Sequence, residues 1–409
     1  MAKETKDLVV GLDIGTSKMM AVVAEITPDG SLRVTGVGVS DSRGLKRGVV
    51  VNIDATVHSI QQALQEAELT ADCKISKVYT GITGNHIRGM NSAGMVTIRD
   101  REVTNADVIK VVEAAKAVTI ATDQRLLLVE PQEFEIDGHD VREPIGMSGL
   151  RLDAKVHIVT GSQSAAENII KCVRRCGLDV EHLLLNPHAS SRAVLTEDEK
   201  ELGVVLVDIG AGTTDVAIYA GGAIRHTAVI PIAGDLITSD IAMALRTPTK
   251  DAEEMKLSYG CAKQLLADPD IQVEVPGLGD REPRFVSKQA LASVIEPRVE
   301  EIFALVLQVV RESGLEEILS SGFVLTGGSS VMQGMVELGE DIFLKPARRG
   351  IPLYRGPLED MVMRPSAATV MGFLEEARAG RMRGLKIAGR NARMKTVMGR
   401  VREFFMGNF

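Results

Sequence analysis

Apolar side chains near the start of the chain form short, nearly continuous runs. Residues 8–12 form one such run, which ends at Asp13, and residues 19–26 form a second. Short apolar runs bounded by turn residues are typical of buried strands. We therefore expect two neighbouring strands joined by a tight turn that begins at Asp13.

Other segments place their apolar residues at helical spacing. Apolar side chains recur every three or four residues after Asp54 and again after Thr104, so we expect a helix to begin at each of these residues. Ser164 and Glu167 have the spacing of a capping box, and Gly177 is expected to end the helix that follows them. The alternation of strands and helices predicts an α/β fold.

The strand–turn–strand pattern occurs twice. Residues 9–17 read VVGLDIGTS, and residues 204–215 read VVLVDIGAGTTD. Asp13 and Asp208 occupy equivalent positions, 195 residues apart. A duplicated unit at this distance predicts two similar lobes that face each other.

Both copies carry residues that suit a phosphate ligand. Glycine lets the backbone approach an anion closely, so that neighbouring N–H groups form an anion-binding turn. Hydroxyl groups add donors, Lys18 adds a cation, and Asp13 and Asp208 are suited to hold Mg²⁺ through water. The candidate residues are Gly15, Thr16, Ser17 and Lys18 in the first copy, Gly210, Gly212, Thr213 and Thr214 in the second, and Gly327, Gly328 and Ser329 in a third glycine turn after the apolar residues 323–325.

One such turn alone is also compatible with a simple hairpin, but two matched copies and a third glycine turn favour a nucleotide site. Residues 13–16, 208–215 and 326–329 resemble the two phosphate motifs and the adenosine motif of the actin-like ATPase superfamily. Residues 185–195 look like its first connecting helix. Within the superfamily, almost the whole chain is most similar to the FtsA family of bacterial cell-division proteins. The resemblance implies that ATP and Mg²⁺ bind between two lobes.

The resemblance also implies a division of the chain. The fold class is α/β, with two actin-like lobes built from duplicated ribonuclease-H-like domains, an inserted extra subdomain and a C-terminal amphipathic helix. The expected segments are 1–83, 162–197 and 360–377 for the first lobe, 84–161 for the inserted subdomain, 198–228 and 311–359 for the core of the second lobe, 229–310 for its small subdomain, 378–395 for a flexible basic linker, and 396–409 for the helix.

Further site residues follow from the same resemblance. Glu253 and Lys256 share one face of a predicted helix and would contact the ribose and adenine, although a solvated surface pair has the same spacing. Gly234 would add a contact on the phosphate side. Asp208 and Asp215 are weak candidates for catalysis. Because residues 185–195 offer no obvious glutamine to orient a water, we expect weak or negligible ATP hydrolysis.

Charge is distributed unevenly along the 409 residues. The whole chain has a net charge of −8, whereas residues 377–409 contain nine Lys or Arg and one acid, so the body carries −16. An acidic body is a poor general binder of nucleic acid.

Four cysteines in a chain of this length do not form a disulfide scaffold. The longest strongly apolar stretch, residues 302–310, is too short to span a bilayer, and no secretory signal is recognised at the start.

The basic tail has two parts. Residues 378–395 contain seven Lys or Arg and no acid, which predicts a linker. Residues 396–409 have an apolar stripe with an arginine at each edge, a pattern typical of a helix lying in a membrane interface. Docking on the body of the protein is the alternative. The predicted membrane contacts are Val397, Met398, Arg400, Val401, Arg402, Phe404, Phe405 and Phe409.

The resemblance implies a function and partners. We expect a protein that polymerises at the cytoplasmic face of the bacterial inner membrane at the septum, anchors the tubulin-like protein FtsZ to anionic lipid, and recruits later division proteins through the inserted subdomain. Other actin-like assembly proteins, of the pilus-machine or MreB type, and a small-molecule kinase are the alternatives. The residues expected to meet the FtsZ tail are Lys288, Arg298, Arg281 and Arg284.

Overall fold

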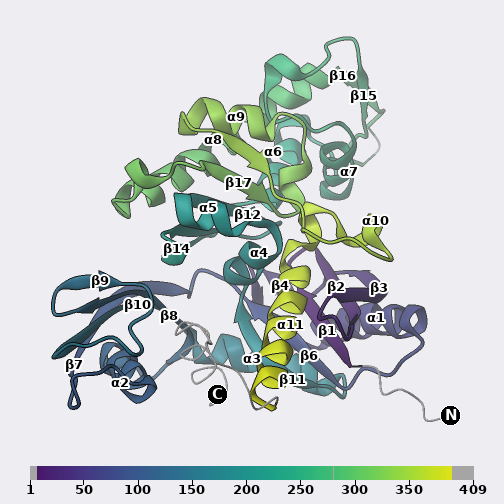
Figure 1. Cartoon of the computed structure of the whole chain (residues 1–409). Helices are drawn as coiled ribbons and strands as arrows, with labels where there is room; N and C mark the ends of the chain where they lie inside the picture. The colour runs from purple at the N-terminus through teal and green to yellow at the C-terminus, as the bar shows by residue number, and fades with distance from the viewer. Residues whose placement is uncertain (1–6, 280, 389–409) are drawn as a thin grey trace.

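The first copy of the repeated motif forms the centre of a five-stranded sheet in the first lobe. The strand order is β11-β6-β1-β2-β3, with β1 antiparallel to β2 and parallel to β6. The strands are β1 (Leu8–Ile14), β2 (Lys18–Ile26), β3 (Leu32–Asp41), β6 (Lys77–Ile82) and β11 (Asp179–Leu185), and a short ribbon joins β4 (Leu45–Lys46) to β5 (Val49–Val50). The computed structural model, drawn in Figure 1, describes residues 7–279 and 281–388 of the chain.

The second copy forms the centre of an equivalent sheet in the second lobe. The order here is β14-β13-β12-β17-β18, with β12 antiparallel to β13 and parallel to β17. The strands are β12 (Val204–Ile209), β13 (Thr214–Ala220), β14 (Ala223–Ile230), β17 (Phe323–Thr326) and β18 (Ala347–Arg349). Because the pairing pattern around the motif is the same in both sheets, the duplication predicted from the sequence is confirmed.

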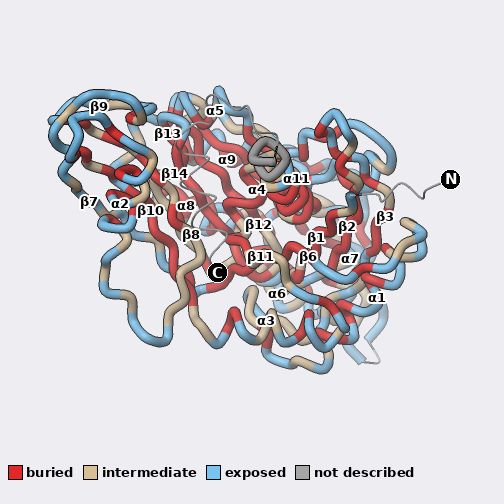
Figure 2. Tube along the Cα trace, turned by 60° about the horizontal axis from the view of Figure 1, so that its bottom comes forward, coloured by how far each residue is buried: buried red, intermediate tan, exposed pale blue. Residues whose placement is uncertain are grey.

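Two helices join the lobes. Helices α4 (Asn186–Val194) and α11 (Ala368–Ala388) share one hydrophobic core with strands of both sheets, in which Val22, Leu206 and Phe373 are buried. On the other face of the first sheet lie α1 (Ile53–Ala71) and α3 (Gln163–Arg175). Figure 2 shows the buried stretches concentrated in the strands and in the helices between them, with exposed loops around the outside.

The second lobe also carries its own helices and a small subdomain. Helices α8 (Lys288–Glu312) and α9 (Met335–Phe343) pack on the outer face of the second sheet, where the ring of Phe343 stacks on Phe323 and is tilted against Phe303. The remaining elements are α5 (Glu197–Leu202), α6 (Gly234–Leu245), α7 (Thr249–Tyr259), η1 (Gln264–Leu266), β15 (Gln272–Val275), β16 (Arg284–Ser287), η2 (Glu316–Ile318), η3 (Gly328–Val331), α10 (Glu359–Val362) and η4 (Pro365–Ala367).

A separate four-stranded sheet lies beside both lobes, on the left of Figure 1. Its order is β7-β10-β8-β9, and α2 packs on one face over a core that includes Val111 and Ile158. The elements are β7 (Arg88–Thr97), α2 (Asn105–Lys116), β8 (Gln124–Ile136), β9 (His139–Val141) and β10 (Arg151–Ser162). This unit, which we call the inserted subdomain, therefore interrupts the first lobe between β6 and α3.

Of the three predicted helix starts, two need correction and one is confirmed. Helix α1 is capped by Asn52, whose side chain accepts from the Ala55 N–H, and Asp54 lies inside its first turn. Helix α3 is capped by Ser162, two residues before the predicted capping box. Thr104 caps α2 as predicted, and its hydroxyl and Asp107 form a capping box.

The last helix is longer than predicted. We expected it to end near residue 377 and a flexible linker to begin at 378, but α11 is helical to Ala388. Arginine, methionine, leucine and lysine all favour helix, and no proline interrupts residues 368–388, so the basic character of this segment does not prevent a helix. None of the helices in residues 7–279 and 281–388 is both long and apolar enough to cross a membrane.

Candidate functional site

A cavity of about 690 Å³ lies between the two lobes, where the three glycine turns meet. This volume is in the range of small-molecule and cofactor sites. Residues far apart in the sequence line it, because each lobe contributes the end of its central strand. The predicted residues among its lining are Asp13, Gly15, Thr16, Ser17, Lys18, Asp208, Gly210, Gly212, Thr213, Asp215, Glu253, Lys256, Gly327, Gly328 and Ser329.

The turn after β1 requires a glycine. The N–H of Gly15 donates to the carbonyl of Lys18 at 3.1 Å, which closes the turn between β1 and β2. A Cβ on Gly15 would lie 2.7 Å from that same carbonyl oxygen, closer than atoms pack. Thr16 and Ser17, in the middle of the turn, line the cavity, and the Thr16 hydroxyl accepts from the N–H of Gly48 at 3.1 Å.

The turn after β12 repeats this geometry. The N–H of Gly210 donates to the carbonyl of Thr213 at 3.0 Å, and Ala211 and Gly212 line the cavity between them. Thr214 is the exception among the predicted residues of this turn, because its buried hydroxyl donates to the carbonyl of Ile232 at 2.7 Å. It therefore supports the turn from behind.

The third turn lies against the second. Gly327 has a φ of 85°, and a Cβ there would lie 2.4 Å from Oδ1 of Asp208. The hydroxyl of Ser329 donates to the carbonyl of Gly210 at 2.8 Å. Gly234 does not line the cavity, but it lies directly behind this contact, since a Cβ on it would meet the Ser329 hydroxyl. Gly234 therefore supports the Ser329 turn from behind, and its predicted phosphate-side contact stays a prediction.

Three carboxylates gather at the base of the cavity. Burial raises the pKa of Asp13 to about 6, with nearby Lys18 opposing the shift and Asp208 adding to it. Burial also raises the pKa of Asp208, and it raises the pKa of Asp215 well above its usual value, with the charge of Asp208 adding to the second shift. Such a cluster is costly for the protein without a cation, and perturbed carboxylates in a cleft are typical of functional sites.

Hydroxyl groups that the sequence did not single out hold two of these carboxylates. Oγ of Ser190, on α4, donates to Oδ2 of Asp208 at 2.5 Å, and the hydroxyl of Thr369, on α11, donates to the same oxygen at 3.3 Å. The hydroxyl of Thr83 donates to Oδ1 of Asp215 at 2.5 Å. No local motif marks Thr83 or Thr369, because each comes from an element that reaches the cavity only in the folded chain, whereas Ser190 lies in the segment 185–195 that resembles the first connecting helix.

Lys256 is a buried residue of the site. Its Nζ donates to the carbonyl of Gly234 at 3.1 Å and to the hydroxyl of Thr238 at 2.8 Å, and it forms an ion pair with Glu253 at 2.7 Å. The Lys256 side chain is 7% exposed and that of Glu253 is 37% exposed. The alternative of a fully solvated surface pair is therefore excluded for the lysine.

Known proteins resemble the chain over most of its length. A protein of Pseudomonas aeruginosa described as cell division protein FtsA is 57% identical over 368 residues, which cover 90% of this chain and 88% of that relative. The chain belongs to the FtsA family of cell-division proteins. The relative from Escherichia coli K12 is 45% identical over 94% of both chains. Models of the FtsA family match residues 205–372, described as cell division protein FtsA, and residues 84–160, described as the SHS2 domain inserted in FtsA.

Solved structures with low identity show the actin-like fold. A PilM–PilN type IV pilus biogenesis complex has a TM-score of 0.65 at 17% identity and covers 90% of this chain and 98% of that chain. MreB5 of Spiroplasma citri, solved with AMPPNP bound, has a TM-score of 0.59 at 15% identity and covers 94% of this chain and all of that one. The predicted actin-like, two-lobed α/β fold with an inserted subdomain is thereby confirmed for this FtsA-family chain.

Most of the basic residues predicted to meet the FtsZ tail have acceptors within the chain. Lys288 lines the cavity between the lobes, and its Nζ donates to Oε1 of Gln333 at 2.7 Å. Arg298 is paired with Asp240 at 2.6 Å and with Glu301. Arg284 donates to a backbone carbonyl, and Arg281 is exposed. Carboxylates therefore neutralise Arg298, whereas Lys288 and Arg284 donate to neutral acceptors and keep their charge.

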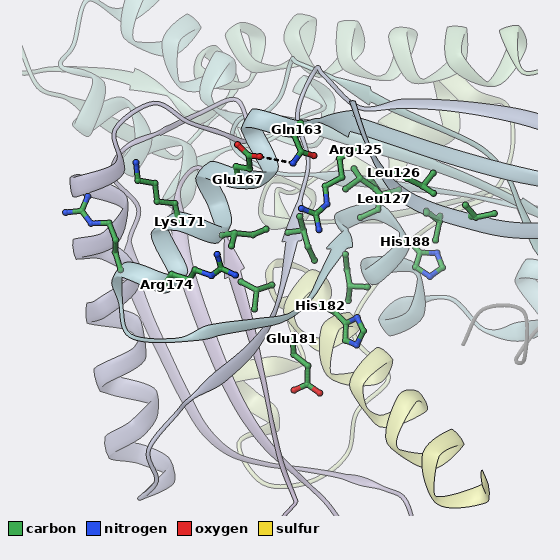
Figure 3. A pocket seen from close by; sticks show the side chains of 18 residues that line it. Arg125, Leu126, Leu127, Gln163, Glu167, Lys171, Arg174, Glu181, His182 and His188 are labelled. Atoms are coloured by element: carbon green, nitrogen blue, oxygen red, sulfur yellow. Dashed lines mark hydrogen bonds between the residues drawn. The ribbon is translucent and has the colours of Figure 1, made fainter. Parts of the chain in front are cut away.

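Figure 3 shows a second cavity, of about 800 Å³, between the inserted subdomain and the first lobe. Strands β8 and β11 contribute an apolar floor that includes Leu127 and Leu183, and Arg125, Lys171 and Arg174 lie around it. None of the predicted nucleotide residues lines this cavity. The predicted membrane residues, Val397 to Phe409, lie outside the described residues.

Proposed function

We propose that this FtsA-family chain binds ATP with Mg²⁺ in the cavity between its lobes. The observation that carries the proposal is the meeting of two equivalent glycine turns, one from each lobe, around the half-buried Asp13 and the buried Asp208 and Asp215. A nucleotide that touches both turns favours the arrangement in which the lobes lie close together. ATP binding would then be a conformational signal for assembly.

The residues present suit a hydrated divalent cation. Mg²⁺ keeps several waters and takes one or two carboxylates, and Asp13 and Asp208 supply these from opposite lobes. The cation would supply charge neutralisation for the phosphates. Ser190 and Thr369 hold Asp208 in place, so its carboxylate needs little reorganisation on binding.

The base and ribose would lie where α7 and the residues before α9 line the cavity. Glu253 and Lys256 belong to this part of the lining, together with Met332 and Gln333. The Glu253 carboxylate suits hydroxyl donors of a ribose, whereas Lys256 is already held by two oxygen acceptors and fixes the shape of the wall. Hydrolysis should be slow, because residues 185–195, which reach the cavity at Asn186, offer no glutamine to orient a water.

A binding titration tests the nucleotide proposal. The Asp208→Asn variant should bind Mg–ATP at least about tenfold more weakly than the wild type, since a charge-assisted contact is lost. Asp72→Asn is the matched control, because Asp72 is exposed and its left-handed conformation suits asparagine. Equal affinities of the two variants would contradict the proposal.

We further propose that the chain polymerises on the cytoplasmic face of the inner membrane at the septum and tethers FtsZ there. The support is the family together with the amphipathic sequence of residues 396–409 and the basic residues before it. A single weak anchor becomes stable attachment when many copies assemble side by side. The inserted subdomain would offer contacts to copies of the chain and to later division proteins.

Co-sedimentation with vesicles tests the membrane part. The full chain should pellet with vesicles that contain anionic lipid, and a chain ending at residue 395 should stay in the supernatant. A variant with Phe404 and Phe405 changed to serine separates apolar insertion from charge, and it should lose most binding while keeping the basic residues. Equal pelleting of all three chains would contradict the proposal.

For FtsZ, we propose the segment 281–298 as the docking surface, with Lys288 and Arg298 as its main contacts and Arg281 and Arg284 beside them. The exposed Arg281 and the partly exposed Arg298 suit an acidic tail. Arg298→Ala should weaken binding of the FtsZ tail, and Arg311→Ala, which removes an exposed arginine at the far end of α8, is the control.

A further inference from the structure

Side chains of the inserted subdomain cap the edge strand of the second lobe. Strand β14 is at the end of its sheet, so its outward backbone groups need partners from elsewhere. The Asn91 amide, on β7, donates to the carbonyl of Arg225 at 3.2 Å. The Gln132 amide, on β8, donates to the carbonyls of Ile224 at 2.9 Å and Arg225 at 3.3 Å. We call this contact the seam. It joins three residues of the inserted subdomain, Asn91, Gln132 and His157, to residues 224–227 of the second lobe.

A buried histidine completes the seam. His157 is 1% exposed, with Nδ1 at 2.6 Å from Oδ1 of Asn91 and Nε2 at 2.9 Å from the hydroxyl of Thr227. Burial lowers the pKa of His157 to about 3, so the ring is neutral and donates through one nitrogen while accepting through the other. The hydrogen bonds of this buried network are all formed in one alignment of the inserted subdomain against β14. Any displacement of the subdomain along β14 leaves several polar groups unpaired.

The inserted subdomain is also tied to the nucleotide cavity where the chain enters it. Thr83 follows β6, and Gly84, with a φ of 137°, begins the inserted subdomain. The Thr83 hydroxyl donates to Asp215 at 2.5 Å, and both residues are buried. Asp215 lines the cavity and is paired with Val229 on β14, two residues from Thr227 of the seam. The Thr83 contact and the Thr227 end of the seam therefore both lie close to Asp215.

We propose that the contact between Thr83 and Asp215 transmits the state of the cavity to the seam. With a cation–nucleotide ligand in the cavity, the Asp215 carboxylate would turn toward the cation and release the Thr83 hydroxyl. Loss of that contact lets the end of β6 move, and the inserted subdomain then shifts relative to β14. The inference rests on the proposed function for the identity of the ligand, and Thr83 acts in it as a positioning residue.

The coupling must act in both directions. If ligand binding loosens the seam, a variant with a loosened seam must bind the ligand more tightly, by the same factor. The seam is polar and hydrogen-bonded rather than a continuous apolar core, which suits an interface that opens and closes. An ion pair between Arg225 and Glu133 adds a further contact that opening would release.

Hydrogen exchange on the full chain tests the proposal. In the wild type, Mg–ATP should accelerate amide exchange in residues 224–230 by roughly 5- to 150-fold, the usual range of allosteric coupling. Thr83→Val keeps the shape of the side chain and removes the hydroxyl, so residues 224–230 should exchange rapidly with or without the ligand. Thr83→Ser keeps the hydroxyl and should behave as the wild type.

Affinity gives a second, independent readout. Thr83→Val and Thr227→Val, which breaks the seam at a distance from the cavity, should each bind Mg–ATP more tightly than the wild type, by a factor in the same range. Binding of Mg–ATP to the wild type without a change in exchange at residues 224–230 would overturn this inference alone. A wild-type chain that fails to bind Mg–ATP would remove the proposed function and this inference with it.

Discussion

The two glycine turns share a backbone and differ in their side chains. In the first, Asp13 faces Lys18, and the turn is so tight that Gly15 leaves no room for a Cβ. In the second, two carboxylates are held by hydroxyl donors from other elements, and a Cβ on Gly210 would lie 3.3 Å from the Thr213 carbonyl, a close contact that a shift of a few tenths of an ångström relieves. Duplication has thus preserved the strand pairing, while the first turn supplies a cation and the second supplies fixed oxygen acceptors.

The difference in space for a Cβ between Gly15 and Gly210 predicts the largest change in stability. Gly15→Ala should lower the free energy of unfolding by about 1–3 kcal/mol, because the turn must widen to admit a methyl group. Gly210→Ala should change it by less than about 1 kcal/mol, since alanine also restricts the unfolded chain. Chemical denaturation of the two variants in the absence of nucleotide measures both values. Equal losses would show that the two turns are equally constrained.

The difference in carboxylate burial predicts a smaller effect of opposite sign. Asp215→Asn should raise the free energy of unfolding at pH 7 by about 1–2 kcal/mol without ligand, because a buried charge beside Asp208 is removed while an oxygen remains for Thr83. Thermal unfolding measures the change, and Asp72→Asn is again the control. A destabilised Asp215→Asn chain would contradict the assigned repulsion between the carboxylates.

The pKa of Asp13 predicts the smallest effect, a pH dependence of the first turn. Without ligand, a pKa raised to about 6 stabilises the folded chain fully below pH 3.8, and this contribution is lost as the pH rises through about 6. Binding of Mg²⁺ requires the ionised form, so the affinity for Mg–ATP should fall by up to roughly tenfold between pH 7 and pH 5.

Calorimetric titration at each pH measures this dependence, with Asp13→Asn beside the wild type so that titration of ATP itself cancels. The ratio of the two affinities should shrink as the pH falls. A constant ratio would mean that Asp13 does not change its protonation in this range, or that it does not contact the cation.

Local patterns were sufficient to predict the turns and the duplication. A glycine that must accommodate a close carbonyl, as at Gly15, and an apolar run before it leave a clear signal in sequence. The equivalent pairing of β1 with β2 and of β12 with β13 follows directly from that signal. The same holds for Thr104, whose capping box lies within four residues.

Features that depend on the tertiary arrangement were not predicted. Thr83, Thr369 and the seam have no local motif, because their partners are more than sixty residues away. Lys256 was ambiguous because its burial depends on Gly234 and Thr238 of another helix, 22 and 18 residues away. The predicted end of the last helix was wrong, because we interpreted clustered positive charge as a sign of a linker. Helix propensity and contacts such as the ion pair of Arg378 with Glu375 continue α11 beyond residue 377.

A crystal structure with Mg²⁺ and a non-hydrolysable ATP analogue tests most directly whether the two turns share one nucleotide. We expect phosphate density between residues 15–18 and 210–213, with the cation within water-mediated reach of both Asp13 and Asp208, and the base beside Glu253 and Lys256. Nucleotide density in the cavity of Figure 3, or density that contacts one turn and leaves the other free, would contradict this expectation.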